Sequence, residues 1–333
     1  FGRYTERATC LARLLEVQTS FDRGHAGATS KWAWILALYK DHERFQKTYA
    51  SADNESVIRF YVSDRDNLGS IVSCIAAARE NARTLRAILP TELWHQVNTF
   101  YNRFRSLPEE ALSGRRLANT CQLVKKECYA QLGVADATIY RDEAWHFFLL
   151  GVLVERADQM SRLLDVRFAQ RRTEDQINTD ALGDFGFWSV LLRSAAAQQA
   201  FLRSSAGKRD PETIARFLIF DSDLPRSIVF CVSELDRVVN ELRSDYQLLG
   251  ATRALEQVDM LRQLLTVASN DARLVDSLHE FNDSVQKHII GLCDEVAYAF
   301  FGTERPDGPT AANGGAISDD PLIGEQSQSQ TMC

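Results

Sequence analysis

The sequence predicts an all-α protein: a helical bundle built from an internal duplication of a multi-helix unit. Apolar residues recur at helical spacing along almost all of the 333 residues, sustained period-2 alternation is absent, and only 7 prolines occur. Two patterns also occur twice in the same order, first at residues 2–17 and 151–166, then at residues 59–74 and 216–231. Each half of the chain is therefore expected to form one set of helices.

The first repeated pattern centres on a glutamate followed by an arginine. Glu6-Arg7 follows Gly2, and Glu155-Arg156 follows Gly151, at the same spacing; an alanine, a second arginine, a leucine pair and a valine then match. Trp32 and Trp188 fall in a compatible register. We expect pseudo-repeats at about 1–140 and 141–300 that share one core in a domain of residues 1–302.

The first half is expected to contain six helices. An apolar stripe of Tyr4, Ala8, Leu11 and Leu15 predicts the helix 1–19, and a stripe from Ile71 to Leu89 predicts the helix 68–88, which Asp66 and Asn67 can cap. The other helices of this half are expected over residues 30–50, 55–62, 91–105 and 110–131.

The second half is expected to contain six more. A stripe from Leu150 to Leu164 predicts the helix 138–170, and Pro225 suits the start of a helix over 225–245. The others are expected over residues 184–204, 211–219, 251–268 and 272–300. Residues 303–333 are rich in Gly, Pro, Ser and Gln, and are expected to form a disordered tail.

Composition limits the function. A net charge of -7 argues against nucleic-acid binding. The longest apolar run, residues 145–154, is too short to cross a membrane, so no membrane association is expected. The 7 cysteines form no Cys-x-x-Cys pair, which favours free thiols in a reducing cytoplasm.

The Glu-Arg pairs allow two interpretations. They can be salt bridges at the seam of the bundle, or two units facing one another can form a pocket for an anionic ligand, because guanidinium groups suit carboxylates and phosphates. Asp158 and Arg162 also form an i,i+4 pair. Burial of such charges is costly unless the network is complete, so their presence in both copies needs an explanation.

A third polar segment lies at residues 79–86. Arg79 and Arg83 share one helical face, Glu80 can pair with Arg83, and Asn81 shares a face with apolar residues and is expected to be buried. The helix either presents a solvated basic stripe or contributes to the same polar centre as Glu6 and Glu155.

Two Glu-x-x-His segments raise the question of a di-iron site. Glu92 with His95, and Glu143 with His146, match the carboxylate–histidine pattern of di-iron bundles, which Glu6 and Glu155 could complete. The two segments do not occupy matching places in the two halves, so we expect no metal or other cofactor. The sequence also lacks the Gly-x-x-x-x-Gly-Lys-Ser/Thr, Gly-x-Gly-x-x-Gly and Gly-x-Ser-x-Gly motifs.

The motifs at residues 2–8, 78–83, 150–158 and 223–231 together resemble the bacterial alpha-E family over about residues 1–300. The resemblance implies an all-helical fold. It also implies association with a circularly permuted ATP-grasp enzyme and a transglutaminase-like protease, and hence a role in ATP-dependent amide or peptide bond formation. Such members begin about ten residues before Phe1, so a preceding segment is expected.

The resemblance implies a set of site residues: Arg3, Glu6, Arg7, Arg79, Glu80, Asn81, Arg83, Glu155, Arg156, Asp158, Asp223 and Arg226. One position departs from the family pattern, because Val152 stands where an arginine commonly follows the glycine of the second copy. The leading hypothesis is a helical partner subunit of an ATP-grasp ligase. The alternative is a stand-alone enzyme, or a protein that binds a small carboxylate or peptide at the Glu/Arg/Asn centre.

Overall fold

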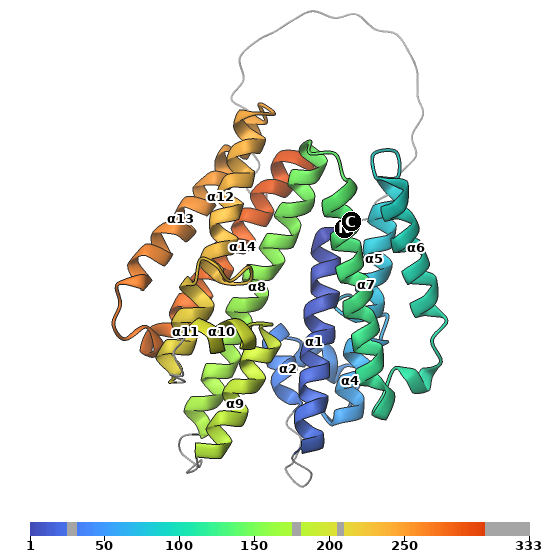
Figure 1. The fold of residues 1–333 in the computed structure, drawn as a ribbon, viewed down its shortest axis with the longest axis vertical. Helices are drawn as coiled ribbons and strands as arrows, with labels where there is room; N and C mark the ends of the chain where they lie inside the picture. The colour runs from blue at the N-terminus through green and yellow to red at the C-terminus, as the bar shows by residue number, and fades with distance from the viewer. Residues whose placement is uncertain (25–31, 175–180, 205–209, 304–333) are drawn as a thin grey trace, which may run out of the picture.

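The computed structural model describes residues 1–24, 32–174, 181–204 and 210–303 (Figure 1). These residues form fourteen α-helices and four short 3-10 turns, and no strand lies among them. The all-α prediction is confirmed. The predicted tail lies, from residue 304 onward, outside the described residues.

The first seven helices lie within the first half of the chain. They are α1 (Gly2–Gly24), α2 (Ala33–Tyr39), α3 (His42–Gln46), α4 (Asn54–Val62), α5 (Ile71–Thr84), α6 (Thr91–Arg105) and α7 (Leu117–Thr138). The 3-10 turns Glu109–Ala111 and Gly114–Arg116 precede α7.

The other seven follow from the second Glu-Arg helix onward. They are α8 (Glu143–Glu174), α9 (Ala181–Ser194), α10 (Gln198–Ser204), α11 (Pro211–Phe220), α12 (Ile228–Ser244), α13 (Thr252–Ser269) and α14 (Leu278–Phe300). Short 3-10 turns at Leu249–Ala251 and Leu274–Ser277 precede the last two.

The repeated sequence patterns fall on corresponding helices. Residues 2–17 lie in α1 and 151–166 in α8, while 59–74 and 216–231 each join the end of one helix to the start of the next. Ser70 and Ser227, which match in the second pattern, both cap a helix by accepting a backbone N–H bond, at 3.2 and 3.1 Å. The duplication itself stays a prediction.

Two helices that the sequence predicts as continuous are broken. The expected helix 30–50 divides at Lys40 (φ 55°) and the expected helix 184–204 divides at Ala196 (φ 57°), both in the left-handed region. Helix ends of this kind are usually marked by glycine or asparagine, and neither residue stands here. The sequence therefore carries no stop signal, and tertiary packing sets both breaks.

The residues predicted to cap one helix and to begin another lie before those helices instead. Asn67 does not cap α5: its amide donates to the Phe60 carbonyl at 3.0 Å and accepts from the Gly69 N–H at 2.9 Å, which closes the turn before the helix. Pro225 lies in the corresponding turn before α12 rather than in its first residues. Ser70 and Ser227 cap these two helices instead, because their hydroxyl oxygens lie close to the first backbone N–H groups, which have no partner within the helix.

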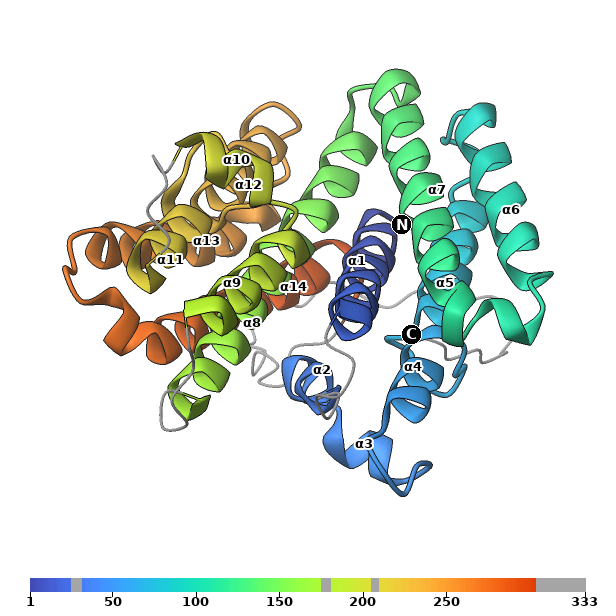
Figure 2. The ribbon, with the colours of Figure 1, turned by 60° about the horizontal axis from the view of Figure 1, so that its bottom comes forward.

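Helices α1 and α8 lie side by side at the middle of the molecule (Figures 1 and 2). Helix α1 also packs against α5 and α7, and α8 packs against α12 and α14, so each central helix carries its own flank of helices. One hydrophobic core runs through both halves, from Ala8 of α1 to Val296 of α14. A smaller apolar cluster lies between α5, α6 and α7.

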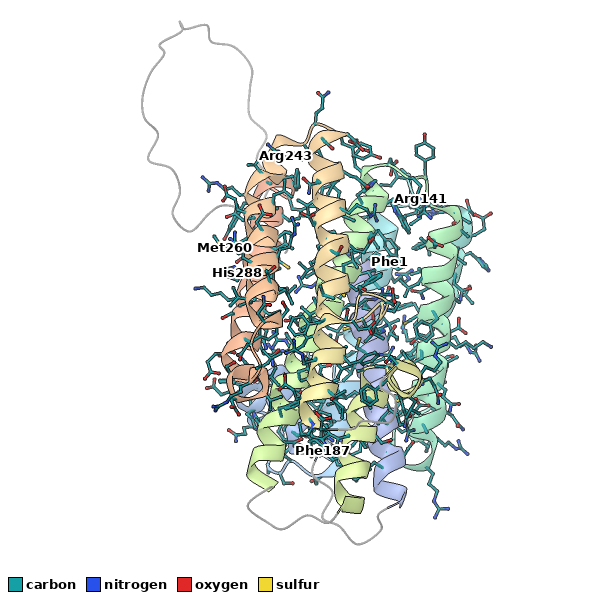
Figure 3. The ribbon with its side chains drawn as sticks, turned by 60° about the vertical axis from the view of Figure 1, so that its left-hand side comes forward. Phe1, Arg141, Phe187, Arg243, Met260 and His288 are labelled. Carbon is teal, nitrogen blue, oxygen red and sulfur yellow. The ribbon has the colours of Figure 1, made fainter. Side chains whose placement is uncertain are left out.

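The long helices run along the length of the molecule. Figure 3 places Arg141 and Arg243 at one end and Phe187 at the other. Within the described part of the chain, no helix is both long enough and apolar enough to span a bilayer.

Candidate functional site

The candidate site begins with the close approach of α1 and α8. A Cβ atom on Gly2 would lie 2.6 Å from the Phe148 carbonyl oxygen, and one on Gly151 would lie 3.3 Å from the Arg3 backbone nitrogen. The two matching glycines therefore let the two backbones come together, because a Cβ at Gly2 would force a shift and one at Gly151 would be tightly packed.

Glu6 of α1 is bound by arginines from the second half of the chain. Arg156 of α8 donates from Nε to Glu6 Oε2 at 3.2 Å, and Arg226, just before α12, contacts Oε1 through Nη2 at 2.5 Å. The Cys10 thiol also donates to Oε1 at 3.5 Å. Both carboxylate oxygens of Glu6 are thus occupied.

Glu155 of α8 is bound by arginines from the first half. Arg7 makes a two-pronged contact, from Nε to Oε1 at 2.6 Å and from Nη2 to Oε2 at 2.9 Å, and Arg3 donates to Oε2 at 3.1 Å. Gln159 donates to Oε1 at 3.0 Å. The two Glu-Arg pairs therefore exchange partners: each glutamate bonds the arginine of the opposite helix.

The two carboxylates are fully buried, and the guanidinium groups around them are partly exposed to solvent. The side chains of Glu6 and Glu155 are 0% exposed, whereas those of Arg226, Arg156, Arg7 and Arg3 are 13%, 20%, 26% and 47% exposed. Burial alone would raise the pKa of Glu6, but Arg226, Arg156 and Arg13 lower it to about 2. Burial alone would lower the pKa of Arg7 and of Arg226, but Glu155 raises the pKa of Arg7 and Glu6 raises that of Arg226.

Arg226 compensates for the departure at Val152. Arg3 supplies the second cation to Glu155 from its own end of α1, but the matching position of α8 is Val152, an apolar residue that is 2% exposed. Arg226 reaches the other glutamate from the turn before α12. Each glutamate therefore has two guanidinium partners, although their second partners come from different places in the fold.

A small cavity opens beside Glu6. It has a volume of about 30 Å³, and its polar lining consists of Cys10, Arg13, Tyr39, Arg156, Gln159, Ser194 and Arg226. This space admits one or two water molecules or a group of similar size. The Tyr39 hydroxyl donates to Gln159 at 2.9 Å, and Arg13 donates to the Tyr129 hydroxyl at 2.7 Å.

Of the remaining predicted residues, Asp158 lies nearest to the centre. It pairs with Arg162 on the same helix at 2.8 Å and is 5% exposed. Asp223 is exposed in the turn before α12, where its N–H bonds the Asp221 side chain. The structure therefore brings together six of the predicted residues, with Asp158 beside them: Arg3, Glu6, Arg7, Glu155, Arg156 and Arg226.

The predicted residues of α5 lie elsewhere. Arg79 donates to Asn98 of α6 at 2.9 Å and stacks over Tyr101 and Trp94. Glu80 pairs with Arg83 on the exposed face, at 2.5 Å. Asn81 is half-buried rather than buried. This helix presents its polar face to α6 and to solvent instead of to the Glu-Arg centre.

The residues considered for a di-iron site do not gather. Glu92, His95 and Glu143 are exposed, and His146 is buried with one ring nitrogen 2.8 Å from Glu241 and the other 2.6 Å from the Asp142 carbonyl oxygen. Because both nitrogens of His146 are engaged and the glutamates of the centre are bound by arginines, these residues do not fit a carboxylate-bridged iron pair.

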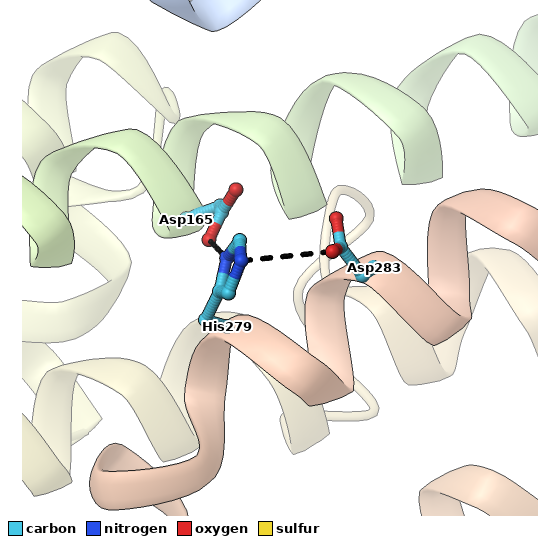
Figure 4. Close-up of side chains that lie close together, drawn as sticks. All are labelled: Asp165, His279 and Asp283. Carbon is cyan, nitrogen blue, oxygen red and sulfur yellow. Dashed lines mark hydrogen bonds and ion pairs between the residues drawn. The ribbon is translucent and has the colours of Figure 1, made fainter.

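A different group of potential metal ligands lies near the start of α14. Within the described residues it is the only cluster of three or more: Asp165, His279 and Asp283 (Figure 4). His279 Nδ1 lies 2.7 Å from Asp165, and Nε2 lies 3.6 Å from Asp283. The bond to Asp165 raises the pKa of His279. The ring thus bridges two carboxylates through opposite nitrogens, as an imidazolium in an ion-pair network does.

Sequence reasoning missed Tyr39 and Gln159 and gave Arg13 no place at a site. Tyr39 ends α2 just before the unpredicted break at Lys40, so its approach to α8 could not be expected. The spacing of Gln159 did contain a signal, because Cys10 and Gln159 match in the repeated pattern and each bonds the glutamate four residues before it.

Fold and site together define an all-helical protein with two Glu-Arg pairs at its centre, in which each glutamate bonds the arginine of the opposite helix. The chain belongs to the Alpha-E family: the family model, described as a predicted alpha-helical domain with a conserved ER motif, matches residues 1–301. Searches among curated proteins and among solved structures found no match.

Proposed function

We propose that this protein is a helical partner subunit of an ATP-grasp-type amide or peptide ligase system. In this role it supplies a docking and organising surface, while the ATP-grasp protein supplies nucleotide binding and bond formation. The Glu-Arg centre joins the two halves of the subunit and keeps its outer helices in one arrangement.

The state of the two glutamates carries this proposal. Every carboxylate oxygen of Glu6 and Glu155 accepts a bond, and neither side chain reaches solvent. A general base works best with a pKa near the operating pH, whereas the pKa of Glu6 is lowered to about 2. Glu6 is therefore a poor proton acceptor, which favours an organising role for the centre over a stand-alone acid–base enzyme.

The partner follows from the resemblance and from the sequence. The resemblance implies association with a circularly permuted ATP-grasp protein and with a transglutaminase-like protease. The chain has no familiar nucleotide-binding loop of its own. A division of labour in which the partner binds ATP agrees with this implied association and with the lack of such a loop in the chain.

We also place the subunit in the reducing cytoplasm. The six cysteines among the described residues are free thiols, and four of them are buried in the core. Burial raises the pKa of Cys74, Cys121, Cys128 and Cys231 to about 12, so these thiols are protonated and inert at neutral pH.

Co-expression with a candidate circularly permuted ATP-grasp protein tests the proposal. We expect one peak containing both chains in size-exclusion chromatography at micromolar concentration, and faster ADP release from the pair than from the ATP-grasp protein alone. Two separate peaks and an unchanged rate of ADP release would contradict the partner role.

Variants distinguish an organising centre from a catalytic one. Glu6→Gln and Glu155→Gln are expected to lower the melting temperature, and to reduce the activity of the pair only in proportion to the loss of folded subunit. Asn81→Ala, at a half-buried position of α5, should leave the melting temperature and the paired activity unchanged. Glutamate variants that melt normally and still abolish paired activity would show that the centre takes part in the reaction.

A further inference from the structure

The cavity beside Glu6 has an excess of positive charge. Three guanidinium groups line it, from Arg13 and Arg156 on the two central helices and from Arg226 before α12. The buried acid next to them is Glu6, whose pKa responds to all three arginines. Glu155 also acts on Cys10 and Tyr39 of the lining, but it is itself paired with Arg7 and Arg3. Glu6 is therefore the one carboxylate that the three lining arginines share.

The three arginines also keep unused donors. Within the described part of the chain, Arg156 bonds Glu6 through Nε alone, and Arg13 bonds Tyr129 through one terminal nitrogen. Arg226 contacts Glu6 with one terminal nitrogen and the weakly accepting Cys10 sulfur with the other, at 3.5 Å. A guanidinium group carries five N–H donors, so several of these donors have no acceptor among the described residues.

Holding these cations together is costly without a counter-charge. Arg13 is 5% exposed as a residue and the Arg226 side chain is 13% exposed, so water screens them poorly. Arg156 and Arg226 share the single charge of Glu6, and Arg13 forms no ion pair among the described residues, so the desolvation of these cations is only partly offset. A bound anion would offset that cost and would use the remaining donors.

We propose that this cavity binds the carboxylate group of a small ligand between Arg13, Arg156 and Arg226. The site is distinct from the partner role and does not depend on it. The 30 Å³ volume suits one carboxylate, with the rest of the ligand directed toward solvent past Arg156, whose side chain is 20% exposed. Bidentate bonding to a planar carboxylate is the geometry that guanidinium groups favour.

Cys10 provides a reporter inside the cavity, since its half-buried thiol lies on the same lining. Iodoacetate and iodoacetamide are nearly the same size and both alkylate thiols, with the sulfur displacing iodide and the thiol proton passing to the buffer. Only iodoacetate carries a carboxylate. A carboxylate site should therefore direct iodoacetate to Cys10.

The experiment measures the alkylation rates of Cys10 and Cys293 in the folded protein by peptide mass spectrometry, at mildly alkaline pH because burial raises the pKa of both thiols. Cys293 is the internal control: it is also half-buried and lies 3.7 Å from a single guanidinium, that of Arg3. We expect the iodoacetate-to-iodoacetamide rate ratio to be about tenfold higher at Cys10 than at Cys293. Acetate, but not acetamide, should compete.

Arg13→Met is the matching variant, because it removes a cation from the cavity without taking a partner from Glu6. It should bring the iodoacetate-to-iodoacetamide rate ratio at Cys10 down to that at Cys293. Because Arg13 also lowers the pKa of the Cys10 thiol, both absolute rates at Cys10 should fall, and the ratio is the quantity to compare. Equal ratios at the two cysteines of the wild-type protein would overturn the proposal. So would protection of Cys10 from both reagents, since the cavity would then admit no small acid.

Discussion

Glu6 accepts a hydrogen bond from Arg156 at 3.2 Å across 150 positions of sequence, while the arginine next to Glu6 in the chain, Arg7, bonds Glu155 on the opposite helix. Adjacent residues on a helix point about 100° apart, so a Glu-Arg dipeptide does not pair with itself and is free to pair with a facing copy. The exchange ties α1 to α8 at the middle of the molecule.

Removal of either glutamate charge should destabilise the fold strongly. Glu6→Gln leaves Arg156 and Arg226 without an anionic partner, and loss of one member of a buried ion pair costs about 3–5 kcal/mol. Glu155→Gln should cost a similar amount because Arg7 and Arg3 lose theirs. Urea unfolding followed by circular dichroism measures both.

Glu80→Gln is the control for that experiment. Glu80 pairs with Arg83, but both side chains are more than half exposed, at 53% and 55%. Exposed ion pairs contribute little to stability because water screens them, so the free energy of unfolding should hardly change. If Glu80→Gln lowered the free energy of unfolding as much as Glu6→Gln, burial would not be the reason that the Glu-Arg ion pairs stabilise the protein.

The glycines at the helix crossing should not tolerate a methyl group. In Gly2→Ala the new Cβ would meet the Phe148 carbonyl oxygen at 2.6 Å, so α1 must shift away from α8 and the protein should lose stability. Gly133→Ala in α7 is the control, because within the described part of the chain no atom beyond its own stretch of helix lies within 4 Å of its Cβ position. That change should stabilise the protein by up to about 1 kcal/mol through helix propensity. Thermal melts that rank the two variants in the opposite order would exclude the close approach.

Acid should weaken the centre through Glu6. Its pKa is about 2 in the folded protein against an ordinary 4.5, so the folded state binds fewer protons than the unfolded state between these values. The contribution of Glu6 to stability is complete above about 4.5 and is lost as pH falls toward 2. The stability gap between wild type and Glu6→Gln should therefore narrow over that range in urea titrations. A constant gap would mean that Glu6 is not held ionised.

Asn282 of α14 is a site where stability can be gained. It is 0% exposed, and within the described part of the chain neither its amide nitrogen nor its oxygen has a hydrogen-bond partner. An unsatisfied buried polar group costs about 1–3 kcal/mol, so Asn282→Leu, of similar size, should stabilise the protein by about that amount. Asn67→Leu is the matched control and should destabilise it, because that buried amide is bonded to Phe60 and Gly69. If Asn67→Leu also stabilised the protein, the hydrogen bonding of a buried asparagine would not determine its contribution to stability.

Periodicity was sufficient to predict the helices but not their interruptions. The stripe from Tyr4 to Leu15 and the stripe from Leu150 to Leu164 both lie in long helices, as expected. The breaks at Lys40 and Ala196 were not predictable, since lysine and alanine usually continue a helix and only the tertiary fold holds them at positive φ.

The repeated Glu-Arg dipeptide predicted a shared polar centre, but not which arginine pairs with which glutamate. The convergence of Arg226 with Glu6 depends on how the turn before α12 lies against α1, and local sequence does not specify that distance. Arg79 shows the converse: its spacing on α5 was compatible with the centre, yet the aromatic faces of Trp94 and Tyr101 on α6 hold its guanidinium instead.

The exchange of partners between the two helices is tested most directly by comparing two double-mutant cycles on the free energy of unfolding. One combines Glu6→Gln with Arg156→Met, and the other combines Glu6→Gln with Arg7→Met. The account predicts a coupling of about 1–3 kcal/mol for Glu6 with the distant Arg156, and a clearly smaller one with the adjacent Arg7. A larger coupling between Glu6 and Arg7 would contradict it.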